Sequence, residues 1–326
     1  MSRIPVRIAG TGTVPAGRPV STAELVARVQ GGLDCAEVEA KTGIVSRYFA
    51  ESGATAAELG ARALQEALAM AELPAAALQR LIFVSSLGGD AMIPATSNIV
   101  AARLGLAGTC DCFDLNNACM GFLSALDVGA RSVATGRSPI GIVVAELGSR
   151  FIVPEDPRPF LVVGDGVAAA VLDTARGAEG LLASWLRNDG TMAGDVTLGH
   201  AGLTGRRETT RFTSSNQHIT ALAIDGFRHS VEAVLAEAAL TLAEIEWVVL
   251  HQPNGALLRR VVEALGLDPA RTTSVVREVG SVGAACIPMS LDRLLRSGRV
   301  RAGDRILMAG VGGGISYGAV ILRVAS

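Results

Sequence analysis

Cys119 is the residue of this chain whose type and position most clearly permit chemistry. It stands in Asp114–Phe122, where an apolar strand-like run ends and a helix pattern of small residues begins. The first turn of a helix carries unpaired backbone N–H groups and the positive end of the helix dipole, and both stabilise a thiolate. The position therefore predicts a nucleophilic cysteine with a lowered pKa. A buried structural cysteine is the alternative interpretation.

Two further segments could supply a base and an oxyanion hole. His251 directly follows the apolar run Trp247–Leu250, and a neutral imidazole near a helix-start cysteine can act as a base or as a hydrogen-bond donor. A structural or solvent-facing histidine is the alternative. The glycines Gly312–Gly314 expose backbone N–H groups, which is typical of an oxyanion hole or of a tight hairpin.

Cys110 and Cys112 form a C-x-C pair whose side chains share one face of a strand. A metal site is conceivable there, but neither a second cysteine pair nor a neighbouring histidine completes it. We therefore expect these thiols to pack in the core, and we expect no metal.

The composition places the chain among layered α/β proteins. Its 326 residues are 49% hydrophobic with a net charge of −2, which allows a large core and gives no reason to expect nucleic acid. The first residues lack the apolar region of a signal peptide, and no long apolar stretch predicts a membrane span. Five cysteines in such a chain favour reduced thiols and a cytoplasmic location.

An internal duplication indicates how these residues are positioned. Segments 78–147 and 245–310 each read strand, helix, strand, helix, strand, with a Leu-Gly-Leu at matching places. The first copy predicts strands over 81–84 and 141–145 and helices over 96–104 and 120–135. The second predicts strands over 247–250 and 305–309 and helices over 256–265 and 282–296. Two similar halves follow, over residues 1–175 and 176–326.

Within this plan, Cys119 and Ser281 lie at equivalent helix starts that should face one another, and His251 lies at a strand end. Other elements expected from the pattern are a strand over 6–11, a helix over 56–71, a strand over 167–172 and a helix over 220–239. Residues 187–217 show no period and read as a long surface loop.

Taken in order, these segments resemble β-ketoacyl-ACP synthase III enzymes of the thiolase superfamily over nearly the whole chain. The order and spacing of the segments are specific, although each one alone is weak. The matching segments are Lys41–Arg47, Asp114–Phe122, Val163–Gly166, His251–Asn254, Gly280–Pro288 and Gly312–Gly318.

The resemblance implies a thiolase-like five-layer α-β-α-β-α fold and a homodimer. Cys119 would accept an acyl group from a thioester of CoA or of acyl carrier protein, and His251 matches the family histidine. The backbone N–H groups of Cys119 and Gly313 would form the oxyanion hole. No metal or redox cofactor is implied, since the phosphopantetheine thioester is itself the substrate.

Three more positions are assigned to substrate binding by the resemblance. Lys41 and Asn254 belong to matched segments, and Ile93 lies in a loop that would close the acyl pocket of the partner subunit. The family places a Trp and an Arg near CoA where this chain has Glu37 and Lys41. A carrier-protein thioester or an unusual acyl-CoA is therefore the expected donor.

Ser281 departs from the family pattern, because the catalytic asparagine of the family falls at this position. Asn and His normally hold the malonyl thioester carbonyl as CO2 leaves, and a serine hydroxyl has a shorter reach. Three hypotheses follow. Cys119 passes its acyl group to a carbon nucleophile in a Claisen-type condensation of fatty acid or polyketide biosynthesis. Alternatively, an alcohol, an amine or a carrier thiol takes the acyl group without decarboxylation. The third hypothesis is a non-catalytic partner subunit.

Overall fold

A five-stranded mixed sheet forms the core of the first half in the computed structural model, which describes residues 3–324. β4 is parallel to both of its neighbours, whereas β7 is antiparallel to both of its own. The strand order is β1 (Val6–Val14), β7 (Asp165–Thr174), β6 (Ile140–Leu147), β4 (Arg80–Val84) and β5 (Asp111–Leu115). Every residue of β6 is buried, as expected for a central strand covered on both faces.

The second half repeats this order, which confirms the duplication. Within the described residues its sheet has four strands, β8 (Gly180–Asn188), β13 (Ser316–Arg323), β12 (Arg305–Gly312) and β11 (Trp247–Leu250). β11 and β12 are parallel, and the other two pairs are antiparallel. A parallel bridge between Val248 and Thr272 occupies the place that β5 has in the first sheet.

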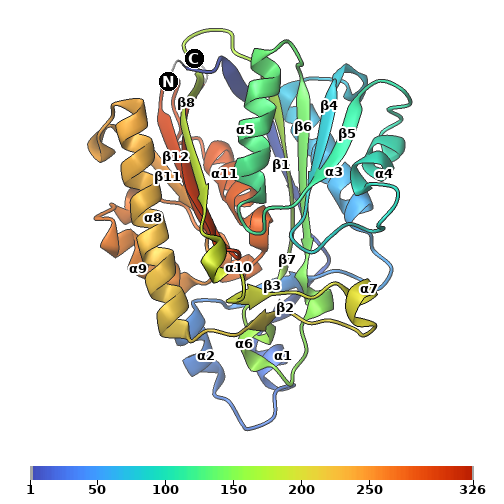
Figure 1. The fold of residues 1–326 in the computed structure, drawn as a ribbon, viewed down its shortest axis with the longest axis vertical. Helices are drawn as coiled ribbons and strands as arrows, with labels where there is room; N and C mark the ends of the chain where they lie inside the picture. The colour runs from blue at the N-terminus through green and yellow to red at the C-terminus, as the bar shows by residue number, and fades with distance from the viewer. Residues whose placement is uncertain (1–2, 325–326) are drawn as a thin grey trace.

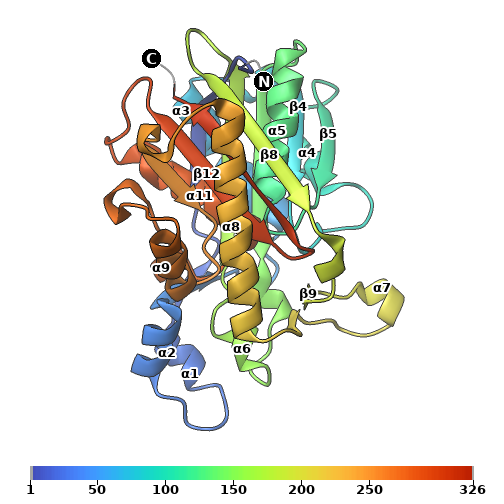
Figure 2. The same ribbon diagram turned by 60° about the vertical axis from the view of Figure 1, so that its left-hand side comes forward.

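Helices separate and cover the two sheets, so the predicted five-layer fold is confirmed (Figures 1 and 2). α5 (Gly121–Ala134) and α11 (Cys286–Arg296) pack between the sheets in one shared hydrophobic cluster. α3 (Ala56–Ala71) and α4 (Thr96–Arg103) cover the outer face of the first sheet. α8 (Asn216–Ala238) and α9 (Gly255–Ala264) cover the second.

α3 shows why the sequence pattern predicted its bounds correctly. Thr55 caps the helix by accepting a hydrogen bond from the N–H of Glu58, and the alanine and leucine residues of one face are buried. Gly60 lets the helix approach the sheet, because a methyl group there would lie 2.5 Å from Val143 Cγ1. The cap and the apolar face are both local sequence features, so the bounds of this helix can be predicted from the sequence.

Residues 187–217, predicted as one long surface loop, contain several short elements. They contain a 3-10 turn η3 (Gly190–Met192), the short strand pair β9 (Val196–Thr197) and β10 (Arg211–Phe212), and a helical turn α7 (Ala201–Thr204). α8 also begins earlier than predicted, because Ser215 caps it by accepting from the N–H of His218. Elements this short leave too little periodicity to recognise in a sequence.

The predicted helix over 282–296 begins later than expected. A 3-10 turn η6 (Gly283–Ala285) precedes α11, which starts at Cys286. Gly283 has a φ of +51°, a conformation outside the right-handed helix, so the helix cannot extend back to Val282.

The remaining elements lie at one end of the sheets and in connections between strands. They are β2 (Arg18–Ser21), α1 (Thr22–Val26), α2 (Cys35–Thr42), β3 (Ser46–Phe49), η1 (Ala75–Ala77), η2 (Gly148–Phe151), α6 (Pro157–Phe160), η4 (Leu242–Glu244), η5 (Pro269–Arg271) and α10 (Val276–Val279). Within residues 3–324, no helix has both the length and the apolar character needed to cross a membrane.

Candidate active site

Cys119 lies in a sharp turn between β5 and α5. Ala118 has a φ of +45°, which reverses the chain direction just before the thiol. Two asparagines hold this turn: the Asn116 side chain accepts from the N–H of Ala118, and Asn117 bonds to both Ser124 and Ser316. α5 begins at Gly121, two residues after Cys119. The predicted position of Cys119 at a helix start is therefore what the structure shows.

The glycines after β12 bring a second backbone segment against this turn. A methyl group on Gly312 would lie 3.0 Å from the backbone nitrogen of Cys119, so only glycine allows this approach. The N–H groups of Gly313 and of Cys119 both interact with the Cys119 thiol and lower its pKa. Two backbone donors directed at one place form the arrangement that an oxyanion hole requires.

The thiol itself is not the activated thiolate that its helix position predicted. Burial raises the pKa of Cys119 to about 12, and the charge of Glu146 raises it further, against the smaller effect of the two N–H groups. Desolvation of a charged sulfur thus outweighs the helix start. Although Cys119 retains some exposure, the enclosure of its sulfur by surrounding atoms favours the neutral thiol at physiological pH.

His251 follows β11 and is almost completely buried, at 3% exposure. Its backbone N–H donates to the carbonyl of Ala309, and its Nδ1 has no hydrogen-bond partner among the described residues. Burial lowers the pKa of its imidazole to about 4, so the ring is neutral. A neutral ring with a free nitrogen can accept or donate a proton.

Gly310 lies between His251 and Met120, the residue that follows Cys119. A methyl group there would lie 2.7 Å from Met120 Sδ and 3.5 Å from His251 Cβ. The residue after Cys119 and the histidine therefore meet over this glycine. Cys286 is also buried, and its sulfur accepts a hydrogen bond from the N–H of Gln252, the residue after His251.

Ser281 is held by its backbone in a short parallel bridge to the segment before β7. Its N–H donates to the carbonyl of Val162 at 2.7 Å, and its carbonyl accepts from the N–H of Gly164 at 3.0 Å. The hydroxyl has no hydrogen-bond partner among the interactions of the described residues, whereas the backbone is fixed on both sides. The bridge joins the two halves at the loop that precedes α11.

The three predicted substrate-binding residues lie on different surface segments. Asn254 caps α9, since its side chain accepts from the N–H of Leu257 at 2.8 Å. Lys41 is exposed on α2 and pairs with Glu37 at 3.2 Å. Ile93 is 89% exposed, and its neighbour Met92 is 82% exposed. Within residues 3–324, no hydrogen bond or ion pair joins any of the three to Cys119.

Glu146 is a member of the site that sequence reasoning missed. It lies near the end of β6 with 1% exposure, and its charge acts on the Cys119 thiol. Burial raises the pKa of its carboxyl to about 7. A signal was present in the sequence, because Glu146 is the one charged residue in the otherwise apolar run Ile140–Leu147.

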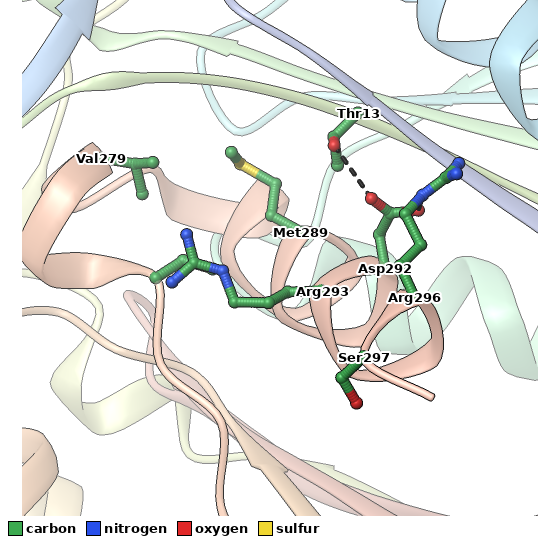
Figure 3. A pocket seen from close by; sticks show the side chains of 8 residues that line it. Thr13, Val279, Met289, Asp292, Arg293, Arg296 and Ser297 are labelled. Atoms are coloured by element: carbon green, nitrogen blue, oxygen red, sulfur yellow. Dashed lines mark hydrogen bonds and ion pairs between the residues drawn. The ribbon is translucent and has the colours of Figure 1, made fainter. Parts of the chain in front are cut away.

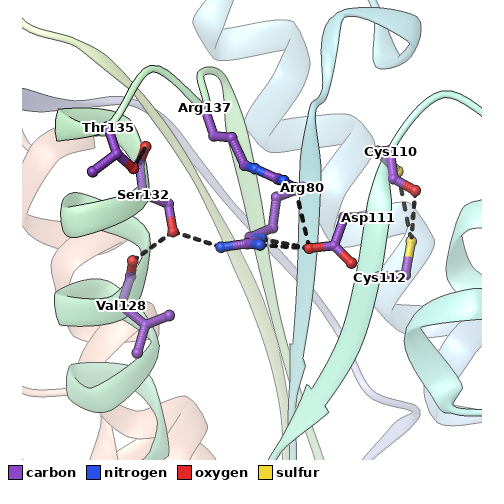
Figure 4. A network of polar contacts seen from close by, with 8 residues as sticks. All are labelled: Arg80, Cys110, Asp111, Cys112, Val128, Ser132, Thr135 and Arg137. Atoms are coloured by element: carbon purple, nitrogen blue, oxygen red, sulfur yellow. Dashed lines mark hydrogen bonds and ion pairs between the residues drawn. The ribbon is translucent and has the colours of Figure 1, made fainter.

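Two surface hollows lie away from these residues. One, of about 410 Å³, is lined mainly by α11, with Thr13 of β1 and Val279 of α10 (Figure 3). Its arginines are already paired, Arg293 with Glu278 and Arg296 with Asp292. The other is bordered by Cys110, whose sulfur lies 3.5 Å from that of Cys112 (Figure 4). Both cysteines are free thiols that pack against the hydrophobic cluster between α3 and the first sheet.

Comparisons with known proteins agree with this geometry. The family model for 3-oxoacyl-[acyl-carrier-protein (ACP)] synthase III matches residues 113–190, and the model for the C-terminal part of that enzyme matches residues 235–324. A β-ketoacyl-[acyl-carrier-protein] synthase III of Streptomyces coelicolor is 33% identical over an alignment of 331 positions, which covers 97% of this chain and 96% of the relative.

Solved structures of the same kind share the whole fold. 3-Oxoacyl-[acyl-carrier-protein] synthase III from Aquifex aeolicus superposes with a TM-score of 0.90 at 26% identity, covering 98% of this chain and 99% of the other. The priming β-ketosynthase of the R1128 polyketide pathway gives 0.91 at 28% identity, covering 99% and 97%. The chain therefore belongs to the 3-oxoacyl-[acyl-carrier-protein] synthase III family of condensing enzymes.

Proposed function

We propose that this protein is an acyltransferase in which Cys119 takes an acyl group from an acyl-CoA or acyl-carrier-protein thioester. The acyl group then passes to a carbon nucleophile in fatty acid or polyketide-type biosynthesis. The observation that supports this most directly is the pair of backbone N–H groups, of Cys119 and Gly313, directed at the thiol. Family membership supports the same reaction class.

The first half-reaction follows from the protonation states of the site. Because the pKa of Cys119 is about 12 and that of His251 about 4, the resting pair is neutral thiol and neutral imidazole. The thiol proton therefore moves to His251 as the sulfur–carbon bond forms, and not before. The thioester oxygen becomes an oxyanion held by the two N–H groups, and the leaving thiolate takes the proton from His251.

The identity of the acceptor depends on Ser281. A single hydroxyl replaces the amide that holds the malonyl carbonyl in the family, and its backbone is fixed by Val162 and Gly164. This favours, as a second candidate function, transfer to an alcohol, an amine or a carrier thiol without decarboxylation. Such acceptors need a base more than a clamp for an enolate, and His251 would be that base.

The proposed partners are the acyl carrier protein and a second copy of the chain. Met92 and Ile93 are 82% and 89% exposed, and an apolar pair of this kind is suited to cover by a partner subunit. Lys41 and Asn254, on the packed helices α2 and α9, are proposed to contact the phosphopantetheine thioester. Sedimentation of the purified protein tests the homodimer.

Intact-mass spectrometry tests the acyl transfer. The protein is incubated with a series of acyl-CoA and acyl-carrier-protein donors, and we expect a mass gain of one acyl group that is absent in Cys119→Ala. Absence of any gain with all donors would support the non-catalytic subunit instead. The acyl-enzyme is then offered malonyl thioesters, alcohols, amines and carrier thiols, and the product identifies the acceptor class.

A further inference from the structure

Glu146 is a buried carboxyl without a cationic partner. None of the ion pairs formed among residues 3–324 includes it, although its side chain is 1% exposed. A buried carboxylate is costly unless hydrogen bonds or a counter-charge stabilise it. When the Glu146 carboxyl is ionised, hydrogen-bond donors must therefore stabilise its charge without a cation.

Those donors come from both halves of the molecule. From the first half, the N–H of Ser86 donates at 2.9 Å and the hydroxyl of Ser85 at 3.3 Å. From the second half, the N–H of Ala284 donates at 3.2 Å, three residues after Ser281. Gly283 permits this approach, because a methyl group there would lie 3.1 Å from Glu146 Oε1.

The carboxyl also lies near the start of α5, which follows the nucleophile. Ala284, which donates to it, has its Cβ 3.6 Å from the place that a methyl group on Gly121 would take, two residues after Cys119. The charge of Glu146 is the largest cause, after burial, that raises the pKa of Cys119. Among the described residues, the hydrogen-bond partners of Glu146 carry no charge: Ser85 and Ser86 directly follow β4, and Ala284 lies in η6. On β7, Glu146 pairs with a glycine, and the neighbouring Asp165 accepts from Ser149 and Ala50 instead.

We propose that Glu146 is a positioning residue that joins the Ser281 turn to β6 and, through its charge, sets how readily Cys119 ionises. When the carboxyl is protonated, burial is the only one of these two effects that opposes ionisation of the Cys119 thiol. When the carboxyl is ionised, a second negative charge close to it makes the thiolate less favourable. The inference rests on the proposed function only in taking Cys119 as the nucleophile.

The test is the pH dependence of Cys119 alkylation by iodoacetamide, followed by peptide mass spectrometry. For the wild type, the logarithm of the rate should rise with pH, flatten near the pKa of Glu146, which is about 7, and then rise again. Glu146→Gln keeps an acceptor for Ala284 but carries no charge. Its profile should be straight, should coincide with the wild type at acid pH and should exceed it at alkaline pH by about tenfold per pKa unit of coupling.

Ser85→Ala is the second variant, because it removes one donor to the carboxylate without altering Glu146. The pKa of Glu146 should rise, and the flat part of the profile should move to higher pH. Asp165→Asn is the matched control, since it neutralises a buried carboxyl of the adjacent strand and should leave the flat part in place.

Identical profiles for the wild type, Glu146→Gln and Ser85→Ala would overturn the proposal. Alkylation needs no acyl donor, so its outcome is independent of whether the enzyme transfers acyl groups. A missing acyl-enzyme with the expected alkylation profiles would refute the proposed function alone. A normal acyl-enzyme with unchanged profiles would refute the role of Glu146 alone.

Discussion

At Cys119, opposing effects act on one sulfur atom. Burial and the charge of Glu146 raise the pKa of the thiol to about 12, whereas the N–H groups of Cys119 and Gly313 lower it. The same two donors would stabilise the tetrahedral oxyanion, which carries its charge on oxygen. A site that leaves the thiol neutral at rest and stabilises charge on the attacked carbonyl favours the transition state over the free thiolate.

Ser281→Asn should change which second substrate the acyl-enzyme accepts. A carboxamide reaches further than a hydroxyl and offers a donor to a malonyl thioester carbonyl, so CO2 release should rise. An oxyanion-type donor is worth on the order of a hundredfold in rate. Release of CO2 from a malonyl thioester, compared with transfer to the native acceptor, measures the change.

Ser281→Ala is the control for this substitution, because it removes the hydroxyl without adding an amide. The backbone bonds to Val162 and Gly164 remain in both variants, so the turn should persist. If Ser281→Asn alters neither decarboxylation nor acyl transfer, the residue does not determine the acceptor.

Among the elements, the turn between β12 and β13 is the one most sensitive to added volume. In Gly312→Ala, the new methyl group would lie 3.0 Å from the backbone nitrogen of Cys119, so the nucleophile turn must shift. A displacement of about 1 Å can cost on the order of a hundredfold in rate, and overpacking typically costs about 1–3 kcal/mol. We expect acyl-enzyme formation to fall at least tenfold by intact mass.

Gly141→Ala separates misplacement of the nucleophile from loss of stability. Its methyl group would meet the Leu64 side chain at 3.2 Å, in the core and away from the turn. We expect a reduced free energy of unfolding, measured in urea, with acylation of the folded protein unchanged. Equal loss of acylation in both variants would contradict the special position of Gly312.

Elements with long periodic patterns were predictable, and short ones were not. The helix Ala56–Ala71 and the strand Trp247–Leu250 have the predicted bounds, because a cap or an apolar run marks them locally. The start of α11 depends on the positive φ of Gly283, and the next residue, Ala284, donates to Glu146 of the other half, a contact that no local pattern indicates. The positions of Cys119 and His251 followed from element ends, whereas their pKa values depend on burial by segments distant in sequence.

For the whole molecule, each half contributes one buried titratable side chain, and burial shifts the pKa values of these two side chains in opposite directions. Burial raises the pKa of Glu146 from 4.5 to about 7 and lowers that of His251 from 6.5 to about 4. Glu146 comes from the sheet of the first half and His251 from the sheet of the second. Between its unfolded-state and folded-state pKa values, each group is neutral in the folded protein but charged in the unfolded chain. The stability of the protein therefore depends on pH over these ranges.

The signs of these shifts predict opposite pH dependences of stability. The contribution of Glu146 is fully present below pH 4.5 and is lost as pH rises towards about 7. That of His251 is present above pH 6.5 and is lost as pH falls towards about 4. Each pKa shift corresponds to roughly 3 kcal/mol of unfolding free energy. In the wild type, the two opposite pH dependences of this free energy therefore offset one another between about pH 4 and about pH 7.

Urea unfolding across this pH range should reveal each slope when the other is removed. In Glu146→Gln only His251 remains, so relative to the wild type the variant should gain stability as pH rises from about 4.5 to about 7. In His251→Gln only Glu146 remains, and stability should instead fall with rising pH relative to the wild type. In the double variant, the unfolding free energy should again depend little on pH, because neither buried group remains to titrate. Curves for the single variants that run parallel to the wild type would mean that these two groups do not control the pH dependence of the interface between the halves.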